Sequence, residues 1–274
     1  MATSSTATQR TYRYLRLSIV GAVLALFVSL IVVASQVGAL PPSISAMLYT
    51  PGRTVFVGVL FAVAVAFLAL SGHSVAQALI DIAAVFAVLI VIIPTPVASG
   101  EVPDVEVVCP EGAIRCVPES EWANIANGML TFAVFGLIAV AGVLALAALQ
   151  QTLSAGVWVT AAAASLVILG ATGWWALART SFLDVGHFVV TTCFFALIAV
   201  VSGLAARGAG RGYRFGYAAI AIGIAIDLTV LLIAAVTRAP VVLAGEVTGL
   251  LLFAAFWILQ TAENWTDSDP AITR

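Results

Sequence analysis

The chain has 274 residues, of which 62% are hydrophobic and only 9% are charged, and its net charge at pH 7 is −2. About one-quarter of the residues in a soluble domain are charged, so this composition excludes a disordered chain and an ordinary cytosolic enzyme. The near-neutral charge also leaves no basic surface for nucleic acid. Apolar runs of about twenty residues instead predict a protein that crosses a membrane several times.

The N-terminal region combines arginines with a long apolar stretch. Arg10, Arg13 and Arg16 precede an apolar segment that continues to about Ala34. The apolar core of a signal peptide is about 7–15 residues long, so this segment is too long to be one. We expect a retained first membrane helix here.

Eight apolar segments follow one another along the chain. Each is long enough to cross about 30 Å of hydrocarbon at about 1.5 Å per residue, and a continuous apolar run favours a helix over a barrel strand. A helix also satisfies its own backbone amides, as the bilayer interior requires. The sequence therefore predicts a single all-α transmembrane domain over residues 1–274, a polytopic helix bundle. The expected spans are 15–36, 54–71, 75–94, 125–149, 155–177, 184–206, 215–236 and 241–260.

The arginines in the loops predict the orientation of these spans. An even number of spans puts both termini on one side, and that side then holds seven of the eleven basic residues, all of them arginine. Because positively charged loops stay in the cytoplasm, we expect both termini to be cytoplasmic. A lysine-free chain rich in Ala, Val and Gly favours a bacterial source, and with it the bacterial cytoplasmic membrane.

Residues 97–124 form the one long polar connection between predicted spans. They contain six carboxylates and one arginine, Arg115, which gives a net charge of −5. This segment is either a solvated cap or an acidic surface that attracts cations or docks a partner membrane protein. Cys109 and Cys116 lie within it, with six residues between them. Because the extracytoplasmic side is oxidising, these cysteines are predicted to form a disulfide rather than part of a zinc site.

Four ionisable residues are predicted to lie at similar depth near the outer leaflet. Arg53 begins the second span, and Asp184 and His187 begin the sixth. Glu246 lies early in the eighth span, within Gly245–Gly249, a spacing typical of close helix contacts. If these spans are neighbours, His187 and the carboxylates form a pocket suited to acid–base or metal-assisted chemistry, with Arg53 holding an anionic headgroup. The alternative is an ion pair between Arg53 and a carboxylate, with His187 as an interfacial hydrogen bonder.

Asp227 lies near the middle of the seventh predicted span. Gly216, Ile220 and Gly223 share its helix face, and glycines allow a neighbouring helix to approach closely. Its carboxylate is either a binding group for a transported proton or cation, or a protonated or hydrogen-bonded packing residue. Asp81, in the third span, lies either in an inner vestibule or at a helix end near the interface.

Short pieces of the chain resemble a group of uncharacterised bacterial, and more narrowly actinobacterial, multi-pass membrane proteins. In that group a Ser-rich segment, a Tyr-Thr-Pro-like turn and an arginine precede a Phe-Val-Gly helix, as in Ser43–Gly58. Asp184–His187 and the ending Phe256–Trp265 are similar to the same group. Together these pieces cover about a third of the chain, and the resemblance implies a membrane protein without implying a chemistry.

A more distant resemblance is to the alkaline ceramidase-like membrane hydrolases, which use a serine, an aspartate and three histidines around a metal. That resemblance implies metal-assisted hydrolysis. This chain has only two histidines, His73 and His187. The predicted topology puts them on opposite sides of the membrane, so a three-histidine zinc site is not expected.

Three functions remain open from the sequence. The favoured one is a non-enzymatic accessory, assembly or envelope-organising factor that contacts a partner through residues 97–124, since the chain has no HExxH, GxSxG or Walker motif. The second is a lipid-processing enzyme that uses the four outer-leaflet residues. The third is a small-solute or proton-coupled transporter that uses Asp227. Membrane lipids are partners in all three, and the sequence identifies no cofactor.

Overall fold

A computed structural model describes residues 6–72, 74–237, 239–267 and 272. These residues form eight α-helices and two short 3-10 helices, and their only strand-like pairing is an isolated bridge between Val97 and Cys116. The prediction of an all-α helix bundle is confirmed. The α-helices are α1 Ala7–Val37, α2 Arg53–Ala69, α3 Val75–Ile92, α4 Trp122–Leu149, α5 Ala155–Leu177, α6 Arg179–Gly208, α7 Arg211–Thr237 and α8 Val242–Glu263. The 3-10 helices are η1 Ser45–Tyr49 and η2 Glu119–Glu121.

Seven of the described helices are long and apolar enough to cross a membrane. The remaining one, α2, has 17 residues, which is the lower end of the length range for a span. Several helices begin earlier than the hydropathy predicts, most of all α1 at Ala7 and α6 at Arg179. The Thr6 side chain accepts a hydrogen bond from the backbone N–H of Gln9 and so caps the polar first turn of α1. The earlier start of α6 places its polar residues one to two turns inside the helix.

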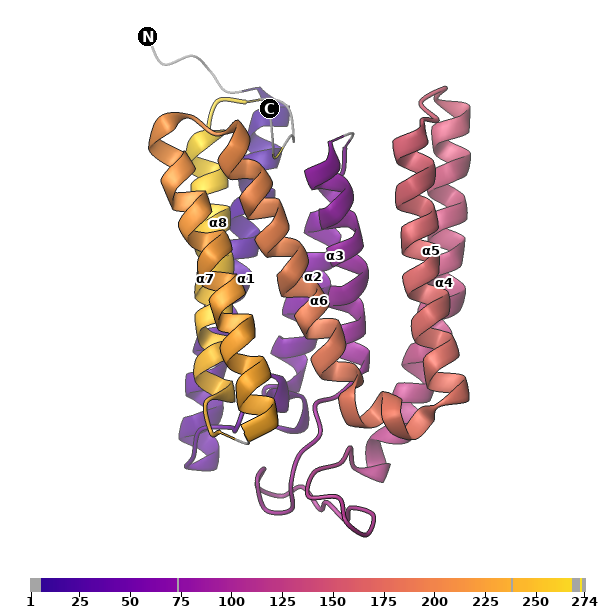
Figure 1. Ribbon diagram of the computed structural model, residues 1–274, viewed down its shortest axis with the longest axis vertical. Coiled ribbons are helices and arrows are strands. Elements are labelled where there is room, and N and C mark those ends of the chain that lie inside the picture. Colours follow the sequence, from indigo (N-terminus) through magenta and orange to yellow (C-terminus); the bar gives the residue numbers. More distant parts are fainter. Residues whose placement is uncertain (1–5, 73, 238, 268–271, 273–274) are drawn as a thin grey trace.

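Six of the helices form a closed ring. Each packs against the next in the order α1, α2, α3, α6, α7, α8, and α8 returns to α1. The α4–α5 hairpin lies outside this ring, where it packs on α3 and α6 (Figure 1). The two helices of the hairpin are among the least buried in the molecule, so most of their surface is available to lipid.

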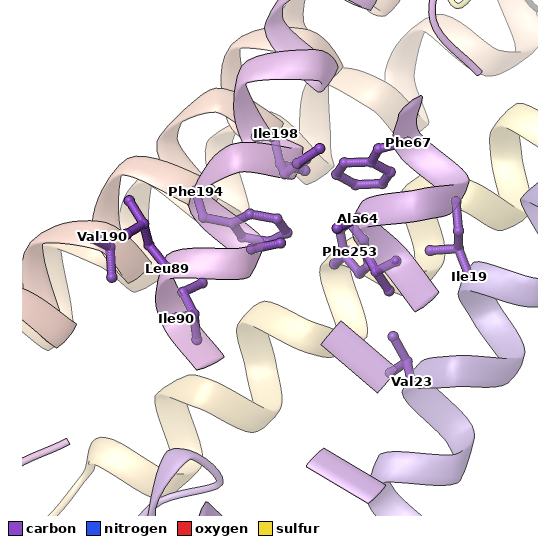
Figure 2. Close-up of a cluster of buried hydrophobic side chains, with 14 of the residues drawn as sticks. Ile19, Val23, Ala64, Phe67, Leu89, Ile90, Val190, Phe194, Ile198 and Phe253 are labelled. Atoms are coloured by element: carbon purple, nitrogen blue, oxygen red, sulfur yellow. The ribbon is translucent and has the colours of Figure 1, made fainter. Parts of the chain in front are cut away.

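Side chains from α1, α2, α3, α6 and α8 fill the interior of the ring (Figure 2). The aromatic rings of Phe67, Phe194, Phe253 and Trp257 come from α2, α6 and α8, and their centroids lie 5.5–6.4 Å apart in contacting pairs. Because lipid is as apolar as these side chains, their contribution comes from dense packing rather than from removal from water. Other residues labelled in this cluster are Ile19, Val23, Ala64, Leu89, Ile90, Val190 and Ile198.

Glycines allow α7 and α8 to pack closely, as the sequence predicts. A Cβ atom on Gly216 would lie 2.8 Å from Leu259 Cδ1, and one on Gly245 would lie 2.5 Å from Leu231 Cδ2. Each of these two glycines thus packs against a leucine of the other helix. A side chain at either position would push the two helices apart.

The beginning of α1 and the end of α8 lie at the same end of the bundle. Gln9 Nε2 donates to the carbonyl of Thr266 at 2.6 Å, and Arg13 Nε donates to that of Trp265 at 2.5 Å. We call this the terminal end, and the opposite end, which carries residues 93–121, the loop end (Figure 1). The beginning of α1 and the end of α8 thus lie at one end, as an even number of spans requires, whereas the number of membrane spans and the cytoplasmic position of the terminal end stay predictions. The arginines described at the terminal end are Arg10, Arg13, Arg16, Arg207, Arg211 and Arg214.

Candidate functional site at the loop end

The predicted disulfide between Cys109 and Cys116 is present, with the two Cα atoms 5.6 Å apart. Cys116 also pairs with Val97 through two backbone hydrogen bonds of 3.1 Å. Val97 and Cys116 belong to a small apolar cluster with Val102, Val107 and, from η1, Ala46. The acidic loop is therefore a folded cap that is pinned to η1 rather than a free chain.

Arg53 links this cap to the start of α2 through an ion pair. Its guanidinium donates to both carboxylate oxygens of Glu121, at 2.8 and 3.0 Å, and Asn124 Nδ2 donates to one of the same oxygens at 2.9 Å. Glu121 immediately precedes α4, so this two-point ion pair joins the start of α2 to the start of α4. The sequence predicts an ion pair for Arg53 but gives no reason to choose Glu121 among the carboxylates.

Tyr49 holds the other edge of the cap. Its hydroxyl donates to the carbonyl of Thr95 at 2.8 Å, which joins η1 to the segment that follows α3. Burial and the negative charge of Glu121 raise the pKa of Tyr49, while the positive charge of Arg53 acts in the opposite direction. The phenol is therefore neutral at physiological pH and remains a hydrogen-bond donor.

An open cavity of about 730 Å³ lies between the cap and the start of α2. Among the described residues that line it, four are acidic and Arg53 is the only basic one. Because the guanidinium of Arg53 is already paired with Glu121, the cavity presents a net negative surface. We call it the outer cavity. Its lining residues are Leu48, Tyr49, Thr50, Arg53, Asp104, Val105, Glu106, Val108, Glu119, Ser120 and Glu121.

Glu246 lies deeper, on the inner side of η1. Its carboxylate accepts hydrogen bonds from the backbone N–H groups of Ile44 and Ser45 and from the Ser45 hydroxyl, the last at 2.9 Å. These bonds tie the segment before α2 to α8, two hundred residues away in the chain. Glu246 and Ser45 also line a second, mostly apolar cavity of about 60 Å³ inside the helix ring, which we call the lumen cavity.

His187 and Asp184 have separate surroundings on α6. His187 is 5% exposed, and its Nδ1 lies 2.5 Å from the carbonyl oxygen of Ile93, at the end of α3. Asp184 is exposed. The His187 contact satisfies a carbonyl that the end of α3 leaves without a helical donor.

The structure does not bring the four predicted outer-leaflet residues into one pocket. Arg53 lines the outer cavity and Glu246 the lumen cavity, whereas His187 and Asp184 line neither. Around the ring α1 lies between α2 and α8, although aromatic side chains of these two helices meet in the interior. The alternative interpretation, an ion-paired Arg53 and a hydrogen-bonding His187, describes the geometry. Within the described ranges, no group of three His, Cys, Asp or Glu side chains is placed to hold a metal ion.

The intramembrane carboxylates have different local roles. Asp227 faces Gly249 of α8, where a Cβ atom would lie 3.2 Å from its Oδ2. No described residue of α8 donates a hydrogen bond to this carboxylate. Asp81 accepts a hydrogen bond from the Ser71 hydroxyl at 2.7 Å, which places it at the α2–α3 turn rather than in a vestibule. His73 lies outside the described residues.

Sequence reasoning missed a buried polar cluster at the terminal end. The Tyr217 hydroxyl donates to Glu263 at 2.8 Å, and Ser202 donates to the carbonyl of Tyr217 at 2.8 Å. Gln260, which is fully buried, donates to the carbonyl of Ile272, and Arg16 is 1% exposed close to this group. The available signal was the concentration of polar residues at the last turns of α6 and α8.

Comparison of the chain with known protein families, curated proteins and solved structures found no match. The geometry of the loop end is therefore the basis for the function proposed below.

Proposed function

We propose that this protein is an accessory factor of the bacterial cytoplasmic membrane that docks a basic segment of a partner membrane protein on its acidic cap. In this proposal the terminal end is cytoplasmic and the cap faces outward, as the arginine distribution predicts. The protein contributes a binding surface rather than a reaction.

The observation that carries this proposal is the outer cavity. It is large enough to receive side chains, since pockets of about 300–1,000 Å³ hold small ligands. Asp104, Glu106 and Glu119 line it without an ion pair among the described residues. The disulfide and the Arg53–Glu121 pair keep these carboxylates in fixed positions, so a ligand does not have to order the loop when it binds.

The negative charge of the outer cavity favours a basic partner segment. A basic segment that carries arginine can form two-point hydrogen bonds with these carboxylates, and its long-range attraction to a cap of net charge −5 speeds encounter. The groups that could perform chemistry nearby have other partners, as Arg53 binds Glu121 and Glu246 binds the η1 backbone. This arrangement favours docking over catalysis.

The test measures binding of a defined cationic peptide to the protein in nanodiscs of uncharged lipid. The probe is a fluorescent ten-residue peptide of alternating Arg and Ser, and its affinity is measured by anisotropy at low and high salt. The variant Glu106→Gln removes a cavity carboxylate. Its matched control, Glu111→Gln, removes the same charge from an exposed position of the loop that does not line the cavity.

We expect Glu106→Gln to weaken binding by about 1.5- to 5-fold, since exposed ion pairs contribute about 0.2–1 kcal/mol. Glu111→Gln should leave the affinity nearly unchanged, and added salt should weaken binding to the wild-type protein. Equal weakening by both variants would indicate attraction to the net charge alone and would contradict the proposed site. Failure of the wild-type protein to bind the peptide saturably would contradict docking altogether.

A further inference from the structure

The turn between α6 and α7, at the terminal end, carries three arginines. Arg207 lies in the last turn of α6, and Arg211 and Arg214 lie at the beginning of α7. All three residues are exposed, and none of their guanidinium groups forms an ion pair or a hydrogen bond with the described part of the chain. We call these three residues the turn arginines.

The carboxylate of Glu263, which reaches this turn from the end of α8, has other partners. One of its oxygens accepts a hydrogen bond from the backbone N–H of Gly210 at 3.2 Å, and the other accepts one from the Tyr217 hydroxyl at 2.8 Å. The first turn of α7 contains no acidic residue. The protein therefore holds the turn in place with Glu263 but supplies no carboxylate to pair with the turn arginines.

The position of Arg211 and Arg214 is unfavourable for α7 itself. The N-terminus of a helix carries a partial positive charge, so a cation in its first turn lowers the stability of the helix, whereas an anion there raises it. The turn arginines are also close in sequence and repel one another. An anion bound at the turn offsets both effects.

An apolar stripe leads away from the turn along the surface of α7. Phe215, Ile222 and Ile226 are 81%, 60% and 59% exposed, and their spacing from Arg211 keeps all four side chains on one face of the helix. Ile222 lies about 16 Å along the helix axis from Arg211, which is about half the hydrocarbon thickness of a bilayer. This face thus presents a cation at the depth of the lipid headgroups and apolar side chains at the depth of the acyl chains of one leaflet.

We propose that the α6–α7 turn binds the headgroup of an anionic phospholipid such as phosphatidylglycerol, with the acyl chains lying along the stripe from Phe215 to Ile226. Arginine suits a phosphate because its planar guanidinium donates two parallel hydrogen bonds, and basic clusters beside membrane helices attract anionic headgroups. A zwitterionic lipid is a poorer ligand, since its choline group adds a cation beside the turn arginines. A free phosphate would neutralise the arginines but leave the stripe unused.

The experiment measures lipid binding to the full-length protein in an uncharged detergent by native mass spectrometry. Dioleoyl phosphatidylglycerol and dioleoyl phosphatidylcholine are titrated separately, and the dissociation constants of the first bound lipid are compared. The variants are Arg211→Gln and the joint replacement of the three turn arginines by glutamine. The matched control is Arg10→Gln, because Arg10 is also exposed and unpaired among the described residues of the terminal end but lies on α1.

A second pair of variants tests the apolar stripe. Phe215→Ala removes the aromatic ring next to the turn. Its control, Phe135→Ala, removes a similarly exposed ring from α4, outside the helix ring.

We expect the wild-type protein to bind phosphatidylglycerol at least about ten-fold more tightly than phosphatidylcholine. Arg211→Gln should weaken phosphatidylglycerol binding about five-fold and the triple variant at least about 25-fold, whereas Arg10→Gln should change it less than about two-fold. Phe215→Ala should weaken binding of both lipids about two- to five-fold, and Phe135→Ala should not. Without lipid, the triple variant should unfold at no lower a temperature than the wild-type protein, because it removes cations from the N-terminus of α7.

Equal affinity of the wild-type protein for the two lipids would overturn the proposal. Equal weakening by Arg10→Gln and Arg211→Gln would also overturn it, because attraction would then depend on net charge alone. Glycerol 3-phosphate distinguishes a lipid from a free phosphate: if it displaces phosphatidylglycerol at a comparable concentration, the site does not select a lipid. An unchanged affinity in Phe215→Ala would contradict the position of the acyl chains. If the triple variant fails to fold, Arg211→Gln and its control decide the question.

This site does not depend on the docking function proposed above, because it lies at the opposite end of the bundle from the outer cavity. It also does not depend on which side of the membrane the terminal end faces, since both lipids are presented in detergent.

Discussion

The ion pair between Arg53 and Glu121 allows a quantitative test of how the cap is held. The perturbation is a double-mutant cycle with Arg53→Gln, Glu121→Gln and the combination of the two. The side chain of Arg53 is 42% exposed and that of Glu121 is 12% exposed, so the pair is neither fully solvated nor buried. Exposed pairs contribute about 0.2–1 kcal/mol, and hydrogen bonds to buried charged groups about 1.5–3 kcal/mol.

Between these limits, the two hydrogen bonds of 2.8 and 3.0 Å predict a coupling energy of about 1–2 kcal/mol. Each single variant should lower the unfolding temperature by about 2–8 °C, because about 2–4 °C corresponds to 1 kcal/mol in a chain of this size. The double variant should be little worse than either single one. The assay is thermal unfolding in detergent, followed by tryptophan fluorescence.

A second cycle within the same loop is the control. Arg115 and Glu101 also form an ion pair, but their side chains are 47% and 24% exposed. Their coupling energy should therefore lie below that of Arg53 and Glu121, within the range for exposed pairs. A coupling of less than about 0.3 kcal/mol for Arg53 and Glu121, or one no larger than the control, would refute the conclusion that this pair fastens the cap.

Three further predictions concern other contacts. Gly245→Ala should destabilise the protein by about 1–3 kcal/mol, because a Cβ atom there meets Leu231, whereas Gly58→Ala, with open space around it, should not; thermal unfolding compares the two. Joint replacement of Cys109 and Cys116 by serine should cost about 2 kcal/mol of local stability, seen as faster amide exchange in residues 97–121 with unchanged helical circular dichroism. Because the pKa of Tyr49 is raised in the folded state, its contribution is complete below the ordinary tyrosine value of about 10 and is lost as pH rises above it. Stability should therefore fall more steeply above pH 10 in the wild-type protein than in Tyr49→Phe, as measured by unfolding across that range.

The helices were predictable because the bilayer imposes their length and composition. Each apolar run had to be a helix of about twenty residues, and the prolines and glycines between runs marked the turns. Errors arose where polar residues continue a helix beyond the apolar run. Arg179 and Ser181 begin α6 although neither is apolar, and Ser181 accepts a hydrogen bond from Trp174 of α5 at 2.7 Å. That contact stabilises the turn between the two helices and lets α6 begin early.

The disulfide and the α7–α8 contact were also predictable, because both depend on neighbours in sequence or on one helix face. Cys109 and Cys116 lie in the same short loop, where closure is easy whatever the rest of the fold. Gly216 and Gly223 share one face of α7, which identifies that face as a close contact with another helix. The helix that occupies it, α8, follows α7 in the chain, and short connections favour antiparallel neighbours.

The partners of the loop-end polar groups were not predictable, since hydropathy gives the depth of a residue in the membrane but not its direction around the bundle. Arg53, His187 and Glu246 do lie near the same end, as expected. Their directions depend on the order of the helices in the ring, which is set by side-chain packing over the whole length of each helix. Arg53 binds Glu121 of the cap, whereas Glu246 binds the backbone of η1. The same order encloses the lumen cavity, so the ring that separates Arg53 from Glu246 also places Glu246 against an apolar interior.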